Sequence, residues 1–394
     1  MSFATESGPE NVVTIKVVGV GGAGNNVVNR MVKSGTQGIE YVAVNTDKQA
    51  LAVSSADQKI QIGEKLTHGQ GAGSDPDVGK RSAEESRNNI AKSLENADMV
   101  FITAGMGGGT GTGAAPTIAD IAREAGILTV GVVTKPFKFE GKRRMDQAMV
   151  GINELLGKVD SLLIIPNDRL KFATDQKVTL ANAFEIADDV LRQAVVSISD
   201  LIKNTGFINL DFADVTCVMK DAGFAHMGVG RAAGKGKAED AARMAVASPL
   251  METSINGARG VLINITGSED MGLEDVETAA NLVQEAAHPD ANIIFGASFD
   301  PSLDDEIRVS VIATGFDEPG KAQAEAAPAA AAAPAAAPVA GMYTAAATAA
   351  TAAPAAAPAP AAAPAAPAAA PAADAAAPAE EDPFDSIFKI FNSK

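Results

Sequence analysis

Gly107-Gly108-Gly109-Thr110-Gly111-Thr112-Gly113 places five glycines in seven positions. The loop follows an apolar run at residues 99–104, which is typical of a buried strand, and a helix-like stretch at residues 116–124 follows it. A strand, a glycine loop and a helix in this order bring bare backbone N–H groups and the positive end of a helix to one place. The two threonines add hydroxyl donors. We therefore interpret residues 107–113 as a phosphate-binding loop rather than a flexible linker.

A second glycine loop, Gly-Val-Gly-Gly-Ala-Gly-Asn-Asn, lies upstream at residues 19–26, between a strand pattern at residues 14–18 and a helix pattern. It matches the dinucleotide fingerprint G-x-G-x-x-G at Gly19, Gly21 and Gly24. Alone, this match fits a tight structural turn equally well. Two strand–loop–helix units could converge on one polyphosphate, whereas a Rossmann enzyme has a single fingerprint. The G-x-x-x-x-G-K-[ST] motif of ordinary P-loop NTPases does not occur, which excludes that class.

Strand-like runs alternate with helical stretches over residues 11–178, which predicts a doubly wound α/β nucleotide-binding domain. The expected strands are residues 14–18, 41–44, 99–103, 127–133 and 161–165. Nucleotides bind at the carboxyl ends of such strands. Asn45-Thr46-Asp47 follows the second strand, and Lys135-Pro136-Phe137 follows the fourth. Another loop, which contains Gly71-Ala72-Gly73, is either a further wall of the phosphate site or a surface turn.

Composition limits the partners of this chain. Its 394 residues carry a formal net charge of −17, and the sequence pI is about 4.6. This acidity argues against nucleic acid and against direct binding to anionic lipid, but it is compatible with metal counter-ions. The single cysteine, Cys217, lies in an apolar run and is expected to be buried and inert. There is neither a signal peptide nor an apolar run of membrane-spanning length, so we expect a cytoplasmic protein.

A long helix and a second domain follow. The apolar residues of 179–203 keep a 3.6-residue period, which predicts a central helix (179–205) roughly 37 Å long, buried between other elements. Residues 206–316 are expected to form a smaller α+β domain. Its predicted strands are residues 215–219, 261–266, 292–297 and 307–313, and its predicted helices are residues 238–247 and 273–287.

Both ends of the chain differ in character from these domains. Residues 1–10 are expected to be a flexible N-terminus, and residues 317–379, nearly all Ala and Pro in their main part, a disordered linker. The last segment, residues 380–394, carries Phe384, Ile387, Phe388 and Phe391 on one helical stripe. We interpret it as a short docking helix for a groove on another protein, the alternative being an incidental tail.

Asn209-Leu210-Asp211-Phe212-Ala213-Asp214 places two carboxylates three residues apart after the long helix. They could bind a cation and orient a water, although a solvated loop with a helix cap fits the local pattern better. If a nucleotide base rests by Phe184 and Asp188, the helix from there to Lys203 already spans about 22 Å. Asp211 and Asp214 therefore cannot easily reach a phosphate in their own subunit. They could reach one in a neighbour stacked head to tail, which would make a filament.

The glycine loops, residues 45–47 and residues 209–214 together closely resemble the FtsZ family, the bacterial cell-division homologues of tubulin, over residues 11–316. The tail from Asp382 to Asn392 is similar to that family's adaptor-binding peptide. The resemblance implies a GTPase that binds GTP or GDP with Mg²⁺, with K⁺ left open. It implies a head-to-tail homopolymer that forms the division ring at mid-cell and meets the membrane only through adaptors.

The resemblance also implies residue roles. Gly22 to Asn26 and Gly109 to Gly111 would contact phosphates, Glu140 and Arg144 the ribose, and Phe184 and Asp188 the guanine. Asn209, Asp211 and Asp214 would enter the next subunit's site and promote water attack, with Asp211 and Asp214 near a cation. Without the resemblance, Glu140 and Arg144 would be a surface ion pair. The full expected nucleotide set is Gly21, Gly22, Ala23, Gly24, Asn25, Asn26, Asn45, Asp47, Gly71, Ala72, Gly73, Gly107, Gly108, Gly109, Thr110, Gly111, Thr112, Gly113, Glu140, Arg144, Asn167, Phe184 and Asp188.

Two alternatives remain at this level. The first is an NAD-dependent Rossmann oxidoreductase, which Gly19, Gly21 and Gly24 would serve but which leaves residues 107–113 without a role. The second is a tubulin-like scaffold that polymerises without hydrolysis, against which the carboxylates of Asp211 and Asp214 argue.

Overall fold

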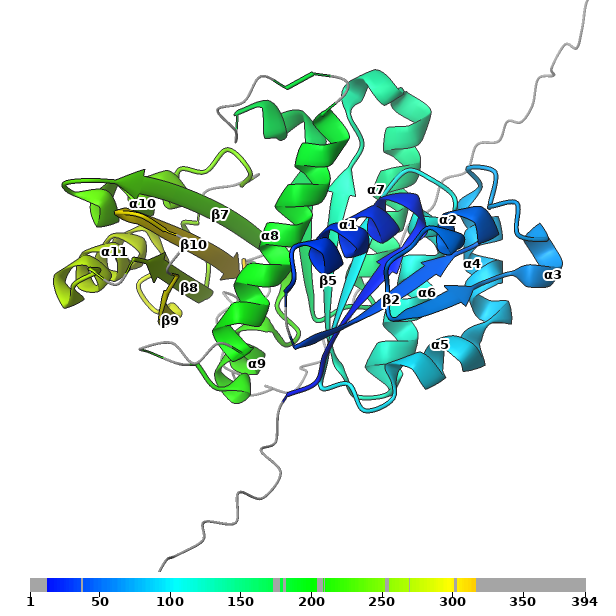
Figure 1. Cartoon of the computed structure of the whole chain (residues 1–394), viewed down its shortest axis with the longest axis horizontal. Helices are drawn as coiled ribbons and strands as arrows, with labels where there is room; N and C mark the ends of the chain where they lie inside the picture. The colour runs from blue at the N-terminus through cyan, green and yellow to red at the C-terminus, as the bar shows by residue number, and fades with distance from the viewer. Residues whose placement is uncertain are drawn as a thin grey trace, which may run out of the picture. The chain divides into compact units, whose positions relative to one another are not determined.

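The computed structural model describes residues 13–36, 38–172, 178–179, 182–203, 208, 210–251, 255–268, 270–300 and 303–316 (Figure 1). The predicted N-terminal segment (1–10), linker (317–379) and docking tail (380–394) lie outside these residues, as does Asn209.

The first sheet of the structure is parallel, and its strand order is β3-β2-β1-β4-β5-β6. This is the order of a doubly wound α/β domain, and the chain reverses direction across the sheet between β1 and β4. The sequence predicted all of these strands except β3. Their bounds are β1 Ile15–Val20, β2 Ile39–Asn45, β3 Gln58–Gln61, β4 Met99–Gly105, β5 Leu128–Lys135 and β6 Ser161–Pro166.

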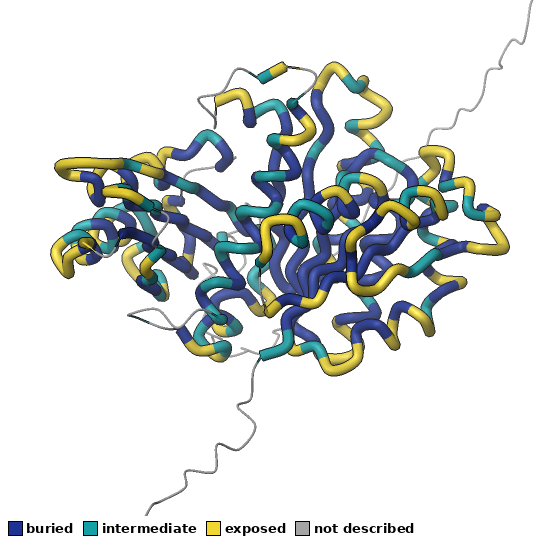
Figure 2. Tube along the Cα trace, in the orientation of Figure 1, coloured by how far each residue is buried: buried dark blue, intermediate teal, exposed yellow. Residues whose placement is uncertain are grey.

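Helices cover both faces of this sheet because successive strand residues point to opposite sides. Ile15 and Val17 of β1 belong to the core beneath one set of helices, whereas Val18 and Val20 belong to the core beneath the other. The central strands are buried along their whole length (Figure 2). The first set is α1 (Gly21–Lys33), α2 (Lys48–Ala52) and α8 (Ala183–Lys203); the second is α4 (Pro76–Glu85), α5 (Arg87–Leu94), α6 (Thr110–Glu124) and α7 (Lys142–Leu156).

Helix α8 runs the length of this domain and packs against α1 (Figure 1). It is the predicted central helix, although it begins at Ala183 rather than at residue 179. Its apolar stripe includes Leu191, Ala194 and Ile198, all of which are buried. Burial on both sides agrees with the expectation that this helix lies between other elements.

The C-terminal domain is a smaller α+β unit, as predicted. Its sheet has the order β7-β10-β8-β9, in which β10 is antiparallel to both neighbours and β8 and β9 are parallel. Leu162 of β6 pairs with Phe224 of β7, so the sheets join into ten strands over the described residues. The sequence did not predict β7. The elements are β7 Gly223–Ala233, α10 Lys237–Val246, β8 Gly260–Gly267, α11 Leu273–Ala286, β9 Asn292–Phe299 and β10 Glu306–Thr314.

The predicted strand at residues 215–219 is wrong. These residues form the end of helix α9 (Phe212–Met219), which begins after Asp211. In a helix, Val215, Val218 and Met219 share one side and are buried, whereas Cys217 points elsewhere and is exposed. The expectation that Cys217 is buried was therefore wrong for the same reason.

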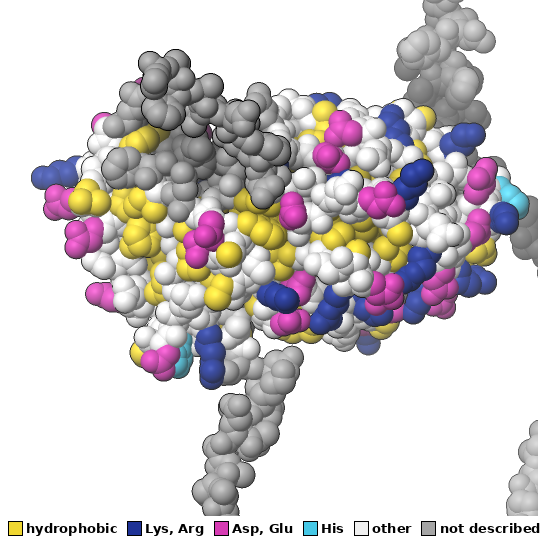
Figure 3. All heavy atoms as spheres, turned by 90° about the horizontal axis from the view of Figure 1, so that it is seen from below, with side chains coloured by type: hydrophobic (Ala, Val, Ile, Leu, Met, Phe, Trp, Pro, Cys, Tyr) yellow, Lys and Arg dark blue, Asp and Glu magenta, His cyan; other side chains and the backbone are white. Residues whose placement is uncertain are grey.

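The surface seen from below mixes charges of both signs, and hydrophobic side chains are exposed between them (Figure 3). The large exposed hydrophobic residues of the C-terminal domain include Leu273 and Phe299. Among the described residues, no helix has both the length and the apolar character to cross a membrane.

Candidate nucleotide site

Two glycine loops leave neighbouring strands at the point where the strand order reverses. Val20, the last residue of β1, pairs with Ala104 of β4. Helix α1 begins at Gly21 directly after β1, and α6 begins at Thr110 after a short turn from β4. The N-termini of two long helices therefore lie side by side at the carboxyl edge of the sheet, where each presents free N–H groups and a partial positive charge.

Glycine is required where the loops touch. A Cβ atom on Gly21, whose φ is +73°, would lie 2.9 Å from the backbone nitrogen of Gly111. A Cβ atom on Gly111 would lie 2.8 Å from the carbonyl oxygen of Gly105. In contrast, Cβ atoms on Gly22 and Gly108 would meet nothing within 4 Å. The loops are thus packed tightly at their base and open above it, which is the shape of a cradle for a polyphosphate.

Polar side chains fix these loops. The Thr46 and Thr110 hydroxyls are 2.7 Å apart, and the Gly107 N–H donates to Thr112 Oγ1 at 2.8 Å. With its amide oriented to satisfy its neighbours, Asn25 donates to the Gly19 and Gly21 carbonyls at 2.8 and 3.1 Å and accepts from Asn45 Nδ2 at 3.1 Å. Asn25 and Asn45 were predicted to contact the nucleotide; in the structure, their side chains join the first glycine loop to the end of β2.

The loop that contains Gly71, Ala72 and Gly73 forms a third wall. The Gly71 N–H donates to the Thr46 carbonyl at 3.3 Å, and a Cβ atom on Gly109 would lie 2.8 Å from Ala72 Cβ. This loop therefore packs on the phosphate loop and is more than a surface turn. Asp47, also predicted in the site, caps α2 by accepting from the Gln49 N–H at 2.8 Å.

Glu140 and Arg144 lie at the rim of the phosphate loop. Arg144 Nε is 3.1 Å from Glu140 Oε2, and Glu140 Oε1 accepts from the Phe137 N–H at 2.8 Å. A Cβ atom on Gly107 would lie 2.7 Å from Arg144 Cγ, so Arg144 packs directly against this glycine of the loop. The ion pair between Glu140 and Arg144, which the local sequence pattern predicts, is therefore present, and it lies at the rim of the candidate site.

Phe184 and Asp188 come from the first turns of α8. The Phe184 ring is half exposed and meets the Phe137 ring edge to face, with 5.6 Å between centroids. Asp188 is buried, and its Oδ2 lies 3.6 Å from Arg30 Nε on α1. Burial raises the pKa of Asp188 to about 6, although Arg30 acts in the opposite direction. Arg30 was not predicted from the sequence, because no local pattern links it to Asp188, and Thr46 was predicted only as part of the loop at residues 45–47, without its bond to Thr110.

Asn167 directly follows β6 at the same edge of the sheet. Its Oδ1 is buried and has no hydrogen-bond partner among the described residues. A buried oxygen without a partner favours a ligand that supplies a donor. Together with the open cradle above Gly22 and Gly108, this oxygen indicates that a nucleotide fits the site.

Asp211 and Asp214 lie at the opposite edge of the sheet. Helix α8 starts beside Phe137, at the carboxyl end of β5, and its last residue, Lys203, donates to the carbonyl of Gly38 just before β2. Its 21 residues span about 31 Å. At the end of α9, the Met219 carbonyl accepts from Ser161 Oγ, in the first residue of β6, at 2.5 Å. Figure 1 shows α9 at the far end of α8 from the loops.

These two carboxylates cap α9 reciprocally. The Asp214 N–H donates to Asp211 Oδ1 at 2.7 Å, and the Asp211 N–H donates to Asp214 Oδ2 at 3.3 Å. Asp211 is exposed and Asp214 is half buried. Within the described residues, no group of three or more His, Cys, Asp or Glu side chains could hold a metal ion. The pair therefore needs oxygens from elsewhere, such as those of a phosphate, to complete a cation site.

Comparisons with known proteins agree over both domains. Residues 14–175 match the GTPase domain of the Tubulin/FtsZ family, and residues 223–317 match the C-terminal domain of the FtsZ family. An empty FtsZ dimer from M. jannaschii is 45% identical, with a TM-score of 0.74 over 77% of this chain and 88% of that one. A point mutant of M. jannaschii FtsZ gives 45% identity and a TM-score of 0.75 over 77% and 91% of the chains.

A CetZ2 protofilament from Haloferax volcanii, with GTPγS bound, shares the fold at 21% identity. Its TM-score is 0.65 over 79% of this chain and 96% of that one.

Proposed function

Because the chain belongs to the tubulin/FtsZ family, whose GTPase domain binds and hydrolyses GTP, we propose that it is a filament-forming GTPase whose hydrolytic site is completed only between stacked subunits. One observation supports the proposal above all. The phosphate cradle lies at the carboxyl edge of the sheet and the carboxylates of Asp211 and Asp214 lie at the amino edge. A head-to-tail stack brings these two edges together, and a stack that does not close is a filament.

The cradle binds and stabilises the polyphosphate. The N–H groups at the start of α1 and α6 face the phosphates, and their fixed dipoles stabilise the charge that develops on the γ-phosphate oxygens. From the neighbouring subunit, Asp211 and Asp214 orient the attacking water, and Asn209 assists them. Mg²⁺, with K⁺ as a further candidate, would be held by the nucleotide phosphates and these carboxylates, and would neutralise phosphate charge.

The base and sugar lie between α7 and α8 in this proposal. Asp188 accepts hydrogen bonds from the N–H groups of guanine, and the exposed edge of Phe184 packs on the ring. Glu140 and Arg144 contact the ribose, and Asn167 Oδ1 receives a donor from the nucleotide. The proposal leaves no role for an NAD-dependent oxidoreductase, since both glycine loops serve one nucleotide.

In the cell, the proposed filaments form a division ring at mid-cell. The tail from Asp382 to Asn392 would dock on division-protein adaptors, which would connect the filament to the membrane indirectly. The substitution Phe388→Ala should then prevent the division ring from recruiting an adaptor, and it should leave GTP hydrolysis unchanged.

The test is phosphate release from GTP as a function of protein concentration. We expect the activity per molecule to be near zero in dilute protein and to rise steeply above a critical concentration that light scattering reports independently. Equal activity per molecule above and below that concentration would contradict the shared site. Filaments without any phosphate release would favour the alternative of a non-hydrolysing scaffold.

A further inference from the structure

Helix α9, which carries Asp211 and Asp214, is held by both domains, since the Val218 carbonyl in its last turn accepts from Thr314 Oγ1 of β10 at 2.9 Å. Before the helix, Ile208 pairs with Ala297 of β9, with both N–H to O distances at 3.2 Å. At its other end, the Met219 carbonyl accepts from Ser161 in the nucleotide-binding sheet. The C-terminal end of α9 is therefore one place where the segment with the carboxylates is bonded to its own GTPase domain.

A buried carboxylate organises the turn that follows α9. Asp160 is 6% exposed and precedes β6. Its Oδ2 accepts from the Thr129 N–H of β5 at 2.8 Å, and its Oδ1 accepts from the Asp221 N–H at 3.4 Å. Its backbone carbonyl accepts from the Gly223 N–H at 2.9 Å. Two strands of the GTPase domain thus hold the turn in place.

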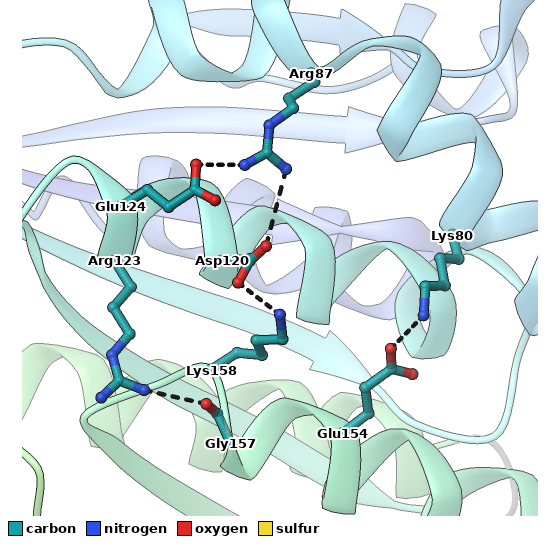
Figure 4. A network of polar contacts seen from close by, with 8 residues as sticks. All are labelled: Lys80, Arg87, Asp120, Arg123, Glu124, Glu154, Gly157 and Lys158. Atoms are coloured by element: carbon teal, nitrogen blue, oxygen red, sulfur yellow. Dashed lines mark hydrogen bonds and ion pairs between the residues drawn. The ribbon is translucent and has the colours of Figure 1, made fainter.

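Asp221 is also held from the side by α6. Its φ is +50°, a conformation that few non-glycine residues adopt, so the turn depends on its bonds. Arg123, at the end of α6, places Nη2 3.0 Å from Asp221 Oδ1. The same guanidinium donates from Nη1 to the Gly157 carbonyl at 3.1 Å, and this second bond is drawn in Figure 4. Since α6 begins in the phosphate loop, one rigid helix connects that loop to the turn after α9.

Other ion pairs in the same region do not reach α9. Figure 4 shows Asp120 of α6 between Arg87 of α5 and Lys158, which follows α7, and Lys80 of α4 pointing to Glu154 of α7. Lys80 Nζ is 2.6 Å from Glu154 Oε1. These pairs hold helices of the GTPase domain to one another. Only the Arg123–Asp221 pair, among the pairs drawn or discussed for this region, joins them to the segment with the catalytic carboxylates.

We propose that Arg123 and Asp221 are positioning residues for GTP hydrolysis. Their ion pair holds the C-terminal end of α9, an eight-residue helix about 12 Å long. It thereby positions Asp211 and Asp214, at the start of that helix, next to the γ-phosphate bound by the neighbouring subunit. The inference rests on the proposed function, because the carboxylates matter only if they act on the next subunit. Neither residue touches the nucleotide.

A double-mutant cycle tests the proposal on the full-length protein. Arg123→Gln and Asp221→Asn each remove the ion pair, and Asn tolerates the left-handed backbone at this position. We expect each variant to lower the kcat of assembled protein by about two- to fivefold, the range of an exposed ion pair. The double variant should be no slower than either single one. GDP affinity, critical concentration and Tm should stay at the wild-type values.

Lys80→Gln and Glu154→Gln form the matched control, since this pair is similarly exposed but does not contact α9. They should leave kcat unchanged. Unchanged kcat in the Arg123 and Asp221 variants, additive losses, or an equal loss in the control would each overturn the inference. So would a parallel loss of GDP affinity, which would indicate a general loosening of the domain. If wild-type turnover does not depend on assembly, the proposed function itself is wrong. The measurement of phosphate release against protein concentration detects that failure independently of the variants.

Discussion

At the scale of single residues, Asp188 shows most directly how the environment changes the titration of a side chain in the candidate site. Burial raises its pKa to about 6, while Arg30 at 3.6 Å stabilises the ionised form. In the unfolded chain its pKa returns to the ordinary value of 3.8. The protonated form therefore stabilises the fold. That stabilisation is fully present below pH 3.8 and is lost as the pH rises through about 6.

This shift predicts a pH dependence of nucleotide binding. An ionised carboxylate accepts both N–H groups of guanine, whereas the protonated form does not. We expect the Kd for GDP to rise as the pH falls through about 6, by up to about tenfold per unit. Isothermal titration between neutral and mildly acidic pH measures it. A constant wild-type Kd over that range would contradict the role of Asp188.

Asp188→Asn is the informative variant at this position. It should flatten the pH profile and raise the Tm of nucleotide-free protein at neutral pH by a few degrees, since no charge is then buried. Its amide can donate to the carbonyl that xanthine carries in place of the guanine amino group, so XDP should bind better than GDP. Continued preference for GDP would argue against contact between this residue and the base.

A second residue-scale prediction separates capping from catalysis at Asp211. Asparagine caps helices about as well as aspartate, so Asp211→Asn should keep α9 and its Tm. It removes the negative charge, and we expect assembled turnover to fall about 10²-fold or more with unchanged GDP affinity. Asp275→Asn is the control for loss of a carboxylate in a helix cap, because Asp275 accepts from the Gly272 N–H at the start of α11, as Asp214 accepts from the Asp211 N–H. Equal turnover in the two variants would make the carboxylate structural only.

At the scale of elements, α9 shows what the sequence could not reveal. The β-branched residues of 215–219 favour a strand locally, but the reciprocal bonds of Asp211 and Asp214 start a helix, and the domain core selects its buried side. The glycine loops were predictable because glycine is needed wherever backbones approach closely. The pairing of Asp188 with Arg30 was not predictable, since contacts between distant helices leave no local pattern.

The glycine loops give an element-scale prediction. Gly21→Ala places a Cβ atom 2.9 Å from the Gly111 nitrogen at positive φ, so it should destabilise the domain by about 1–3 kcal/mol and abolish GDP binding. Gly108→Ala meets no protein atom within 4 Å, so it should fold normally and weaken only GDP binding. Gly272→Ala, where the nearest atom is 3.6 Å away, is the control for both. Thermal melts and GDP titration separate the two effects, and equal Tm losses at Gly21 and Gly108 would contradict the cradle.

At the scale of the whole molecule, the proposed division of the site between two subunits follows from topology. Parallel strands place all their carboxyl ends at one edge, so the sequence order of loops was enough to predict the nucleotide edge. The length of α8 then placed Asp211 and Asp214 far from it. What the sequence left open was the attachment of α9, which depends on Ser161 at the start of β6 and on Asp160 just before that strand.

A shared site predicts complementation between subunits that are each inactive with GTP. Asp211→Asn subunits keep a GTP crevice but lack the catalytic carboxylate, and Asp188→Asn subunits keep the carboxylate but should prefer xanthine nucleotides. When the two variants are mixed in equal amounts with GTP and XTP, some interfaces join the GTP-loaded site of an Asp211→Asn subunit to the intact Asp211 of an Asp188→Asn subunit. We expect GTP turnover per GTP-binding subunit to recover to roughly half the wild-type value, because neighbours are drawn at random. Labelled phosphate released from GTP is the measurement, and co-sedimentation shows that mixed filaments form. If mixed filaments form and GTP turnover stays at the level of Asp211→Asn alone, each subunit must hydrolyse its own nucleotide, and the two edges of the sheet would have no shared chemistry.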